Sequence, residues 1–283
     1  MNENERITPF LRWAGGKNWL VPYVGELIEQ LDFNNYYEPF LGGAAVFLSL
    51  NKINQAFLSD LNGELVDTYN AIKHCPDSVI GLLKEMDNTK EDYYKIREEN
   101  PETLEAIAAR FIYLNQTSYN GLYRVNKKGE YNVPYGYRNN WNYDFEKLNR
   151  ISGKLQSAEI ACGDFSLFES DIKENDLVFL DPPYTVSHNQ NGFIKYNQKL
   201  FSLDDQYRLR DFIDSIAEKQ AYYILTNAAH EKILEIFSRG DTVFSLDRNS
   251  LIGGKNASRS KVSEFVFTNV PVPLTMESFV LKQ

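Results

Sequence analysis

Residues 178–184 read VFLDPPY and combine an apolar run with groups that can do chemistry. The apolar residues predict a buried strand, and Pro182 and Pro183 end its pairing and hold the backbone extended. Three groups are then fixed at the strand tip: the Asp181 carboxylate, the Pro182 carbonyl and the Tyr184 ring. They would offer a single ligand two hydrogen-bond acceptors and an aromatic surface. The structural alternative is an ordinary proline turn.

A second motif, YYEPFLGGAAVF at residues 36–47, predicts a strand, a tight turn and then a helix. Glu38 ends the strand, and Gly42 and Gly43 occupy the turn. Glycines at a strand-to-helix turn let a ligand approach the backbone closely, as in nucleotide-binding folds. Because the spacing is not GxGxxG, a dinucleotide site is poorly supported. The alternative is a glycine turn that serves packing alone.

Two more acids follow predicted strands. Asp60, in LSDLNGE, is placed to accept hydrogen bonds from ribose hydroxyls, or to cap a helix that starts at Leu61. Asp164, in GDF, can bond an exocyclic amine while Phe165 stacks on a purine, although a loop aspartate is more often a cap or a solvated turn residue. Ligands in open α/β sheets gather at the carboxyl ends of strands. Four such ends carry acids: Glu38, Asp60, Asp164 and Asp181.

The N-terminal motif PFLRWAGGK spans residues 9–17 and places Trp13 and Lys17 on either side of a glycine pair. We expect both side chains to be exposed, where they could cover a bound cofactor and pair with a carboxylate. The alternative is a helix start with a tryptophan that packs in the core.

The elements that position these motifs follow an α/β pattern, because short apolar runs alternate with longer amphipathic ones. Strands are predicted at residues 35–39, 55–60, 157–163, 176–181, 221–227, 241–247 and 263–269. Helices are predicted at residues 44–50, 64–73 and 203–219, the last with Ser202 as its N-cap. Between residues 73 and 155 the pattern changes to helices, such as 102–114, and a long polar, aromatic segment. We therefore expect a catalytic domain of residues 1–72 and 156–283, with an inserted helical domain at 73–155.

Composition narrows the class of protein. The two cysteines make no disulfide framework, and we find no signal peptide or apolar run of membrane-spanning length, so we expect a soluble, cytoplasmic protein. The three histidines lack metal-ligand spacing, so no metal is expected. The net charge of −9 argues mildly against wholesale nucleic-acid binding, yet only the contacting face matters.

Two stretches of the chain are basic. Residues 110–138 hold five basic residues and one acid, interleaved with tyrosines, and residues 248–261 hold four bases and no acid. Such segments suit contacts to nucleic-acid phosphates. The alternative is a pair of solvated loops.

Taken together and in this order, the motifs resemble the α group of amino-methylating DNA adenine methyltransferases, of the Dam and DpnII type, over nearly the whole chain. FLRWAGGK resembles that family's N-terminal S-adenosylmethionine motif, EPFLGG its glycine loop and DPPY its catalytic motif. Residues 114–136, LNQTSYNGLYRVNKKGEYNVPYG, resemble its DNA-reading segment. The resemblance implies a Rossmann-like, mostly parallel seven-stranded sheet with an antiparallel final pair and an inserted helical recognition domain.

The resemblance also implies roles for individual residues. Asp181 and the Pro182 carbonyl would accept the two N6 protons of a flipped adenine, on which Tyr184 would stack. The S-adenosylmethionine site, whose product is S-adenosylhomocysteine, would include Trp13, Lys17, Glu38, Pro39, Phe40, Gly42, Gly43, Asp60, Asp164, Phe165 and Asp181. The contacts to double-stranded DNA would come from Tyr119, Asn120, Leu122, Arg124, Asn126, Pro134, Arg138, Lys255, Arg259 and Lys261.

Among these, Arg124 would read a guanine edge, and Leu122 and Pro134 would contact neighbouring bases. These positions suggest a GATC site. We also expect the enzyme to act as a monomer. The chain departs from the family after NVP, with GYRN at residues 136–139 in place of GRYK. Two other readings stay open: an N4-cytosine or RNA adenine methyltransferase with the same amino chemistry, and a non-catalytic DNA-binding protein on the same fold. The absence of a cysteine beside DPPY argues against cytosine C5 chemistry.

Overall fold

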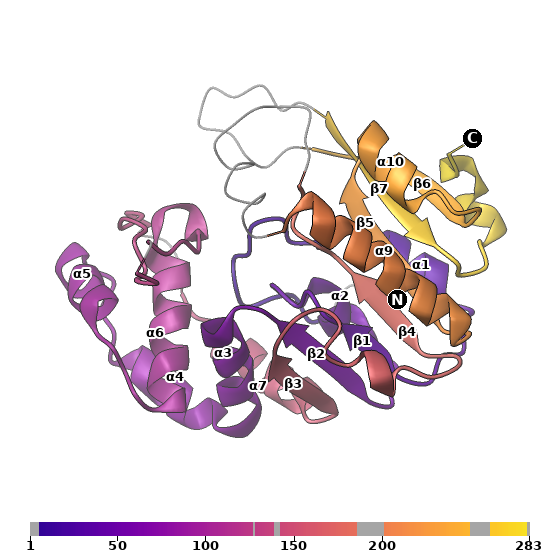
Figure 1. The fold of residues 1–283 in the computed structure, drawn as a ribbon. Helices are drawn as coiled ribbons and strands as arrows, with labels where there is room; N and C mark the ends of the chain where they lie inside the picture. The colour runs from indigo at the N-terminus through magenta and orange to yellow at the C-terminus, as the bar shows by residue number, and fades with distance from the viewer. Residues whose placement is uncertain (1–5, 127, 139–141, 186–200, 250–260, 282–283) are drawn as a thin grey trace. The chain divides into compact units, whose positions relative to one another are not determined.

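The computed structural model describes residues 6–126, 128–138, 142–185, 201–249 and 261–281 (Figure 1). The chain forms two compact units, residues 1–21 with 41–164 and residues 22–40 with 165–283. The described helices are α1 (Val21–Ile28), α2 (Ala45–Ser49), α3 (Gly63–His74), α4 (Pro76–Lys84), α5 (Lys90–Glu98), α6 (Leu104–Thr117), α7 (Phe145–Leu155), α9 (Leu203–Glu218) and α10 (Glu231–Phe237). The strands are β1 (Tyr36–Glu38), β2 (Ala56–Asp60), β3 (Ala158–Cys162), β4 (Leu177–Leu180), β5 (Tyr222–Ala228), β6 (Thr242–Asn249) and β7 (Lys261–Thr268).

Within the described residues the strands form a seven-stranded sheet in the order β3-β2-β1-β4-β5-β7-β6. The pairs β2–β3, β1–β4 and β4–β5 are parallel, whereas β7 runs antiparallel to both β5 and β6. The predicted mostly parallel sheet with an antiparallel final pair is therefore confirmed. All seven predicted strands are present, with ends that differ by no more than two residues.

Strand register decides which side chains meet at the carboxyl edge of the sheet. Leu180 is paired with Leu225, so the next residues, Asp181 and Thr226, lie at the same level of two neighbouring strands. All four residues of β4 are buried, as expected for a central strand covered on both faces. Helix α9 packs against β5 and begins with a capping box between Ser202 and Asp205, which confirms the predicted N-cap.

The helical segment after α3 belongs to the same compact unit as the glycine turn at Gly42. Helix α6 packs against α3, α4 and α5, and it corresponds to the helix predicted at residues 102–114. After α6 comes the short 3-10 helix η2 (Tyr119–Gly121) and then an extended loop. This loop is closed by the antiparallel bridges Ser118↔Tyr135 and Val125↔Tyr131.

Candidate active site

The glycine turn and Asp60 are joined by hydrogen bonds. The Asp60 Oδ2 atom accepts the Gly42 N–H at 3.0 Å, and Oδ1 accepts the Asn62 N–H at 3.0 Å. The Tyr69 hydroxyl donates to the Gly42 carbonyl at 3.0 Å, so the turn is fixed from both sides. Gly42 has φ 45°, in the left-handed region that favours glycine. Hydrogen bonds from within the chain thus set the conformation of the turn.

Asp60 does not cap the following helix, since Asn62 accepts the Leu65 N–H and is the N-cap of α3. Burial raises the pKa of Asp60, and backbone N–H groups of Asn62, Gly42 and Leu61 oppose the shift. A carboxylate has about four lone-pair positions, and these backbone bonds leave part of that capacity for hydroxyl groups. The chemistry of Asp60 therefore fits a ribose acceptor.

Trp13 covers the glycine turn. A Cβ atom built on Gly42 would lie 2.8 Å from the indole Cδ1 and Nε1 atoms, and one on Gly43 would lie 3.2 Å from the Trp13 Cβ. The indole stacks on Phe111 and Tyr123, with ring centroids 6.3 and 5.9 Å away. The structure thus brings Trp13, the glycine turn and Asp60 together, with Trp13 half-buried.

Lys17 corrects one expectation of the sequence, because its side chain is buried and only 5% exposed. The chain turns back at Gly16, whose N–H donates to the Trp13 carbonyl, and the Lys17 Nζ atom donates to the Gly15 carbonyl at 3.0 Å. The motif therefore folds over its own lysine instead of presenting it to solvent.

In the other unit, a threonine holds the candidate catalytic carboxylate. The Thr226 hydroxyl, fully buried on β5, donates to Asp181 Oδ1 at 2.7 Å. Pro182 is buried and Pro183 half-buried. The Tyr184 hydroxyl donates to a carboxylate oxygen of Glu264, which is buried on β7. Asp181 is therefore hydrogen-bonded to a residue of β5 and Tyr184 to a residue of β7, the strand next to β5.

A buried chain of polar side chains supports the residues after DPPY. The Asn227 amide donates to Gln206 Oε1 at 3.0 Å, the Gln206 amide donates to the Thr185 hydroxyl at 2.9 Å, and that hydroxyl donates to the Phe201 carbonyl. Gln206 and Asn227 are fully buried. Sequence reasoning missed these residues as well as Thr226 and Glu264. Two features of the sequence could have indicated three of them. Thr226 and Asn227 are polar residues near the end of the apolar strand YYILTNA, and Gln206 lies on the apolar face of α9.

The remaining expected cofactor residues lie at strand ends. Glu38 is buried and accepts the Tyr36 hydroxyl at 2.8 Å. Phe40 and Phe165 stack with ring centroids 5.7 Å apart, and Arg208 lies over the Phe165 ring at 4.9 Å. Pro39 is buried, and Asp164 is half-buried in the turn after β3. Their contact with a ligand stays a prediction.

The expected DNA-reading residues lie on the loop after α6. Arg124 is exposed, and its guanidinium donates from Nε to Asn132 Oδ1 at 2.7 Å and from Nη2 to the Asn132 carbonyl at 3.1 Å. Tyr119 is 53% exposed, and Asn120 beside it has φ 56°. Pro134 and Arg138 are exposed, whereas Leu122 and Asn126 are half-buried. Lys255 and Arg259 lie outside the described residues, as does the side chain of Lys261.

Within the described ranges, no group of three or more His, Cys, Asp or Glu side chains is arranged to hold a metal ion. Over the same residues, no helix is both long and apolar enough to cross a membrane.

The mixed sheet, with its antiparallel β7 and its motifs at strand ends, is consistent with the methyltransferase class of α/β folds. The sequence model of the family described as "D12 class N6 adenine-specific DNA methyltransferase" matches residues 13–250. The chain therefore belongs to the D12 class of N6 adenine-specific DNA methyltransferases. Its enzymatic class is that of a transferase, and its substrate is DNA.

Several relatives have similar lengths. The Type II methyltransferase M1.LlaDCHI of Lactococcus lactis subsp. cremoris is 33% identical over 274 residues, which cover 93% of this chain and 95% of the relative. The Type II methyltransferase M.MjaIII of Methanocaldococcus jannaschii is 37% identical over 244 residues, covering 78% and 84%. The DNA adenine methylase of Escherichia coli (strain K12) is 29% identical over 266 residues, covering 91% and 93%.

Proposed function

We propose that this enzyme transfers a methyl group from S-adenosylmethionine to N6 of an adenine flipped out of duplex DNA, within a GATC site. The observation that carries the proposal is the fixed carboxylate at the end of β4. Asp181 is oriented by the buried Thr226 hydroxyl and is followed by two prolines that stiffen the Pro182 carbonyl. Preorganised acceptors of this kind stabilise charge that develops during a reaction.

The chemistry rests on two hydrogen bonds to one amino group. The adenine N6 lone pair is delocalised into the ring, which makes the amine a poor nucleophile. Asp181 and the Pro182 carbonyl would each accept one N6 proton, which localises the lone pair and stabilises the positive charge that forms as the N–C bond is made. The methyl C–S bond would break as the N–C bond forms, leaving S-adenosylhomocysteine. The positively charged N6 would then lose one proton to the Asp181 carboxylate or to water. Tyr184 would stack on the purine, with its hydroxyl held by Glu264.

The donor supplies a methyl group on a sulfonium centre. Asp60 would accept hydrogen bonds from its ribose hydroxyls, and Trp13 would lie beside it over the glycine turn. Glu38, Asp164 and the remaining cofactor residues predicted from the sequence complete this proposed site. The residues that hold both substrates would act mainly by aligning them, because alignment converts a bimolecular step into an effectively unimolecular one.

The DNA contacts complete the proposal. Arg124 would read a guanine edge, and the exposed Tyr119 would wedge into the stack left open by the flipped base. We retain residues 73–155 as the recognition domain and residues 1–72 with 156–283 as the catalytic domain. The monomeric state and the cytoplasmic location also stay predictions. The names of two relatives support a role in type II restriction–modification.

One assay tests the reaction and the site. Purified protein is incubated with labelled S-adenosylmethionine and with duplexes that differ only in having or lacking GATC. Label is expected on adenine of the GATC duplex alone. Equal labelling of both duplexes would refute the GATC assignment, and label on cytosine in place of adenine would refute the reaction. Asp181→Ala is expected to abolish transfer and to retain binding of S-adenosylhomocysteine; loss of both would mean that Asp181 has another role.

A further inference from the structure

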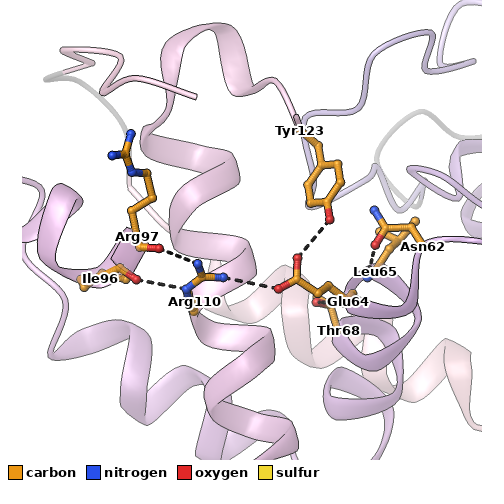
Figure 2. A network of polar contacts seen from close by, with 8 residues as sticks. All are labelled: Asn62, Glu64, Leu65, Thr68, Ile96, Arg97, Arg110 and Tyr123. Carbon is orange, nitrogen blue, oxygen red and sulfur yellow. Dashed lines mark hydrogen bonds and ion pairs between the residues drawn. The ribbon is translucent and has the colours of Figure 1, made fainter. Parts of the chain in front are cut away.

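Tyr123 contacts the donor side and the DNA-reading side of the same compact unit. Its ring stacks on Trp13 with centroids 5.9 Å apart and an interplanar angle of 27°. Its hydroxyl donates to Glu64 Oε2 at 3.0 Å (Figure 2). The ring also packs against Phe111 of α6, with centroids 5.3 Å apart. Toward the loop, it packs edge-on against Tyr131 at 5.8 Å, and the next residue is Arg124.

Both donor-side contacts lead directly to the proposed donor site. Trp13 is the residue that covers Gly42. Glu64 lies in the first turn of α3, two residues after the N-cap Asn62, whose N–H is bonded to Asp60. A shift of the indole or of the start of α3 would therefore move the partners of Tyr123.

Glu64 is held by two side-chain partners at the start of α3, with 40% of its side chain exposed. Its Oε1 atom pairs with Arg110 Nη1 at 3.4 Å, while its Oε2 atom takes the Tyr123 hydroxyl (Figure 2). The Arg110 side chain is only 10% exposed, and it is held by the Ile96 carbonyl at 3.0 Å and the Arg97 carbonyl at 2.6 Å. Because two backbone carbonyls of α5 hold the guanidinium, α5 and α6 fix the position of the cation that pairs with the Glu64 carboxylate.

Tyr131 connects the Tyr123 ring to the loop residues proposed to contact DNA. The Tyr131 hydroxyl donates to the Leu122 carbonyl at 2.6 Å, and its backbone bridges to Val125. The neighbouring Asn132 holds the Arg124 guanidinium. Displacement of the Tyr123 ring would therefore shift both bridged segments of the loop, residues 122–125 and residues 131–132, and with them Arg124.

A second connection joins the same two regions. The Asn115 side chain accepts the Arg12 N–H at 2.8 Å and donates to the Arg12 carbonyl at 2.8 Å. Gly121 packs so closely on the Arg12 side chain that an added Cβ would lie 2.7 Å from it. The N-terminal motif is thus fastened to the end of α6, from which the reading loop departs.

We propose that Tyr123 is a positioning residue that couples donor binding to DNA recognition. The inference rests on the proposed function, which assigns the donor to Trp13 and Asp60 and the guanine edge to Arg124. A donor that contacts Trp13 and Asp60 favours one placement of the Tyr123 ring, and that placement orders the loop for Arg124. Coupling between two sites is reciprocal, so the correct DNA site also strengthens donor binding.

The test measures a ratio of dissociation constants. The Kd of a GATC duplex is determined with and without saturating S-adenosylhomocysteine, and also for a duplex with the site scrambled. For the wild type the product is expected to tighten GATC binding by at least about fivefold, the lower end of ordinary coupling. A purely structural residue would weaken binding equally in both states and leave the ratio unchanged, so the ratio reports coupling alone.

Three variants make the test specific. Tyr123→Phe removes the hydroxyl that donates to Glu64 and keeps the ring, so it is expected to reduce the ratio. Tyr123→Ala also removes the ring, and its ratio is expected to fall to about one. Tyr94→Phe removes a hydroxyl elsewhere in the same unit and is expected to keep the wild-type ratio. A wild-type ratio near one, or a full ratio in folded Tyr123→Ala, would overturn the inference. If the alanine variant does not fold, an unchanged ratio in Tyr123→Phe overturns it instead.

Failure of the proposed function gives a different result. In that case the wild type would not transfer label to the GATC duplex, whatever the binding ratio. If label transfer to GATC is normal in the wild type and in Tyr123→Phe but the two ratios are equal, only the coupling role of Tyr123 is wrong.

Discussion

Replacing Thr226 by valine removes one hydroxyl beside Asp181 and leaves the shape of the side chain almost unchanged. Thr226 is fully buried, and its Oγ1 atom donates to Asp181 Oδ1 at 2.7 Å. A hydrogen bond to an ionised acceptor contributes roughly 1.5–3 kcal/mol net. If the oriented carboxylate is needed mainly in the transition state, that free energy appears in the barrier, and kcat falls roughly 10- to 150-fold.

The assay is methyl incorporation under saturating DNA and donor, together with the Kd of S-adenosylhomocysteine, which is expected to stay within about twofold of the wild type. Thr268→Val is the matched control, because Thr268 is also fully buried in the sheet and donates to the Tyr223 carbonyl at 2.5 Å. We expect the control to lower the melting temperature and to leave kcat nearly unchanged. A Thr226→Val enzyme with wild-type kcat, or equal losses in both variants, would refute the role of Thr226.

Three other predictions concern the donor turn and the DNA loop. Gly42→Ala places a Cβ 2.8 Å from the Trp13 indole at a φ of 45°, so it should lower stability by roughly 1–3 kcal/mol and weaken binding of S-adenosylhomocysteine, as measured by thermal unfolding and calorimetry. Burial raises the pKa of Asp60, and protonation would remove its capacity to accept hydrogen bonds from the donor. Affinity for S-adenosylhomocysteine should therefore fall as the pH falls through that pKa. Asp60→Asn should weaken binding at neutral pH and remove this pH dependence. Arg124→Ala should cost roughly 1–3 kcal/mol of discrimination at one base pair in competition binding.

Controls separate these effects from general damage. Gly25→Ala introduces a Cβ with no atom within 4 Å and should leave donor binding intact. A pH profile that persists in Asp60→Asn would assign the titration to another group. Lys128→Ala, on the same loop as Arg124, should weaken binding to all duplexes alike; uniform weakening in Arg124→Ala as well would contradict its role as a base reader.

The sequence was sufficient for the sheet because its strands are short runs rich in apolar residues, bounded by polar and turn residues. The motif ends, such as Asp181 and Asp60, could be placed at strand ends for the same reason. The helix cap was harder to assign, since Asp60 and Asn62 are both good capping residues and lie two positions apart. Only the three-dimensional path of the turn directs Asp60 to Gly42 and leaves the cap to Asn62.

Contacts between residues distant in sequence could not be predicted. Thr226 is 45 residues from Asp181, and Glu264 is 80 residues from Tyr184, so neither pairing leaves a local pattern. Lys17 was expected at the surface because lysine is rarely buried, and its burial depends on a turn that brings the Gly15 carbonyl to its ammonium group. The two long-range hydrogen bonds depend on strand register, and the burial of Lys17 depends on turn geometry; neither follows from residue type alone.

The anchored Arg110 has a consequence for how this part of the molecule opens. Helix α5 has nine residues and would be marginal as an isolated helix. Its last turn is held by Arg110 of α6, which also pairs with Glu64 of α3. Amide hydrogens of α5 should therefore exchange with solvent in step with those of α6, as one cooperative unit, and not as an independently fraying helix. Arg110→Met should uncouple them, so that α5 exchanges first while α3 and α6 keep their protection.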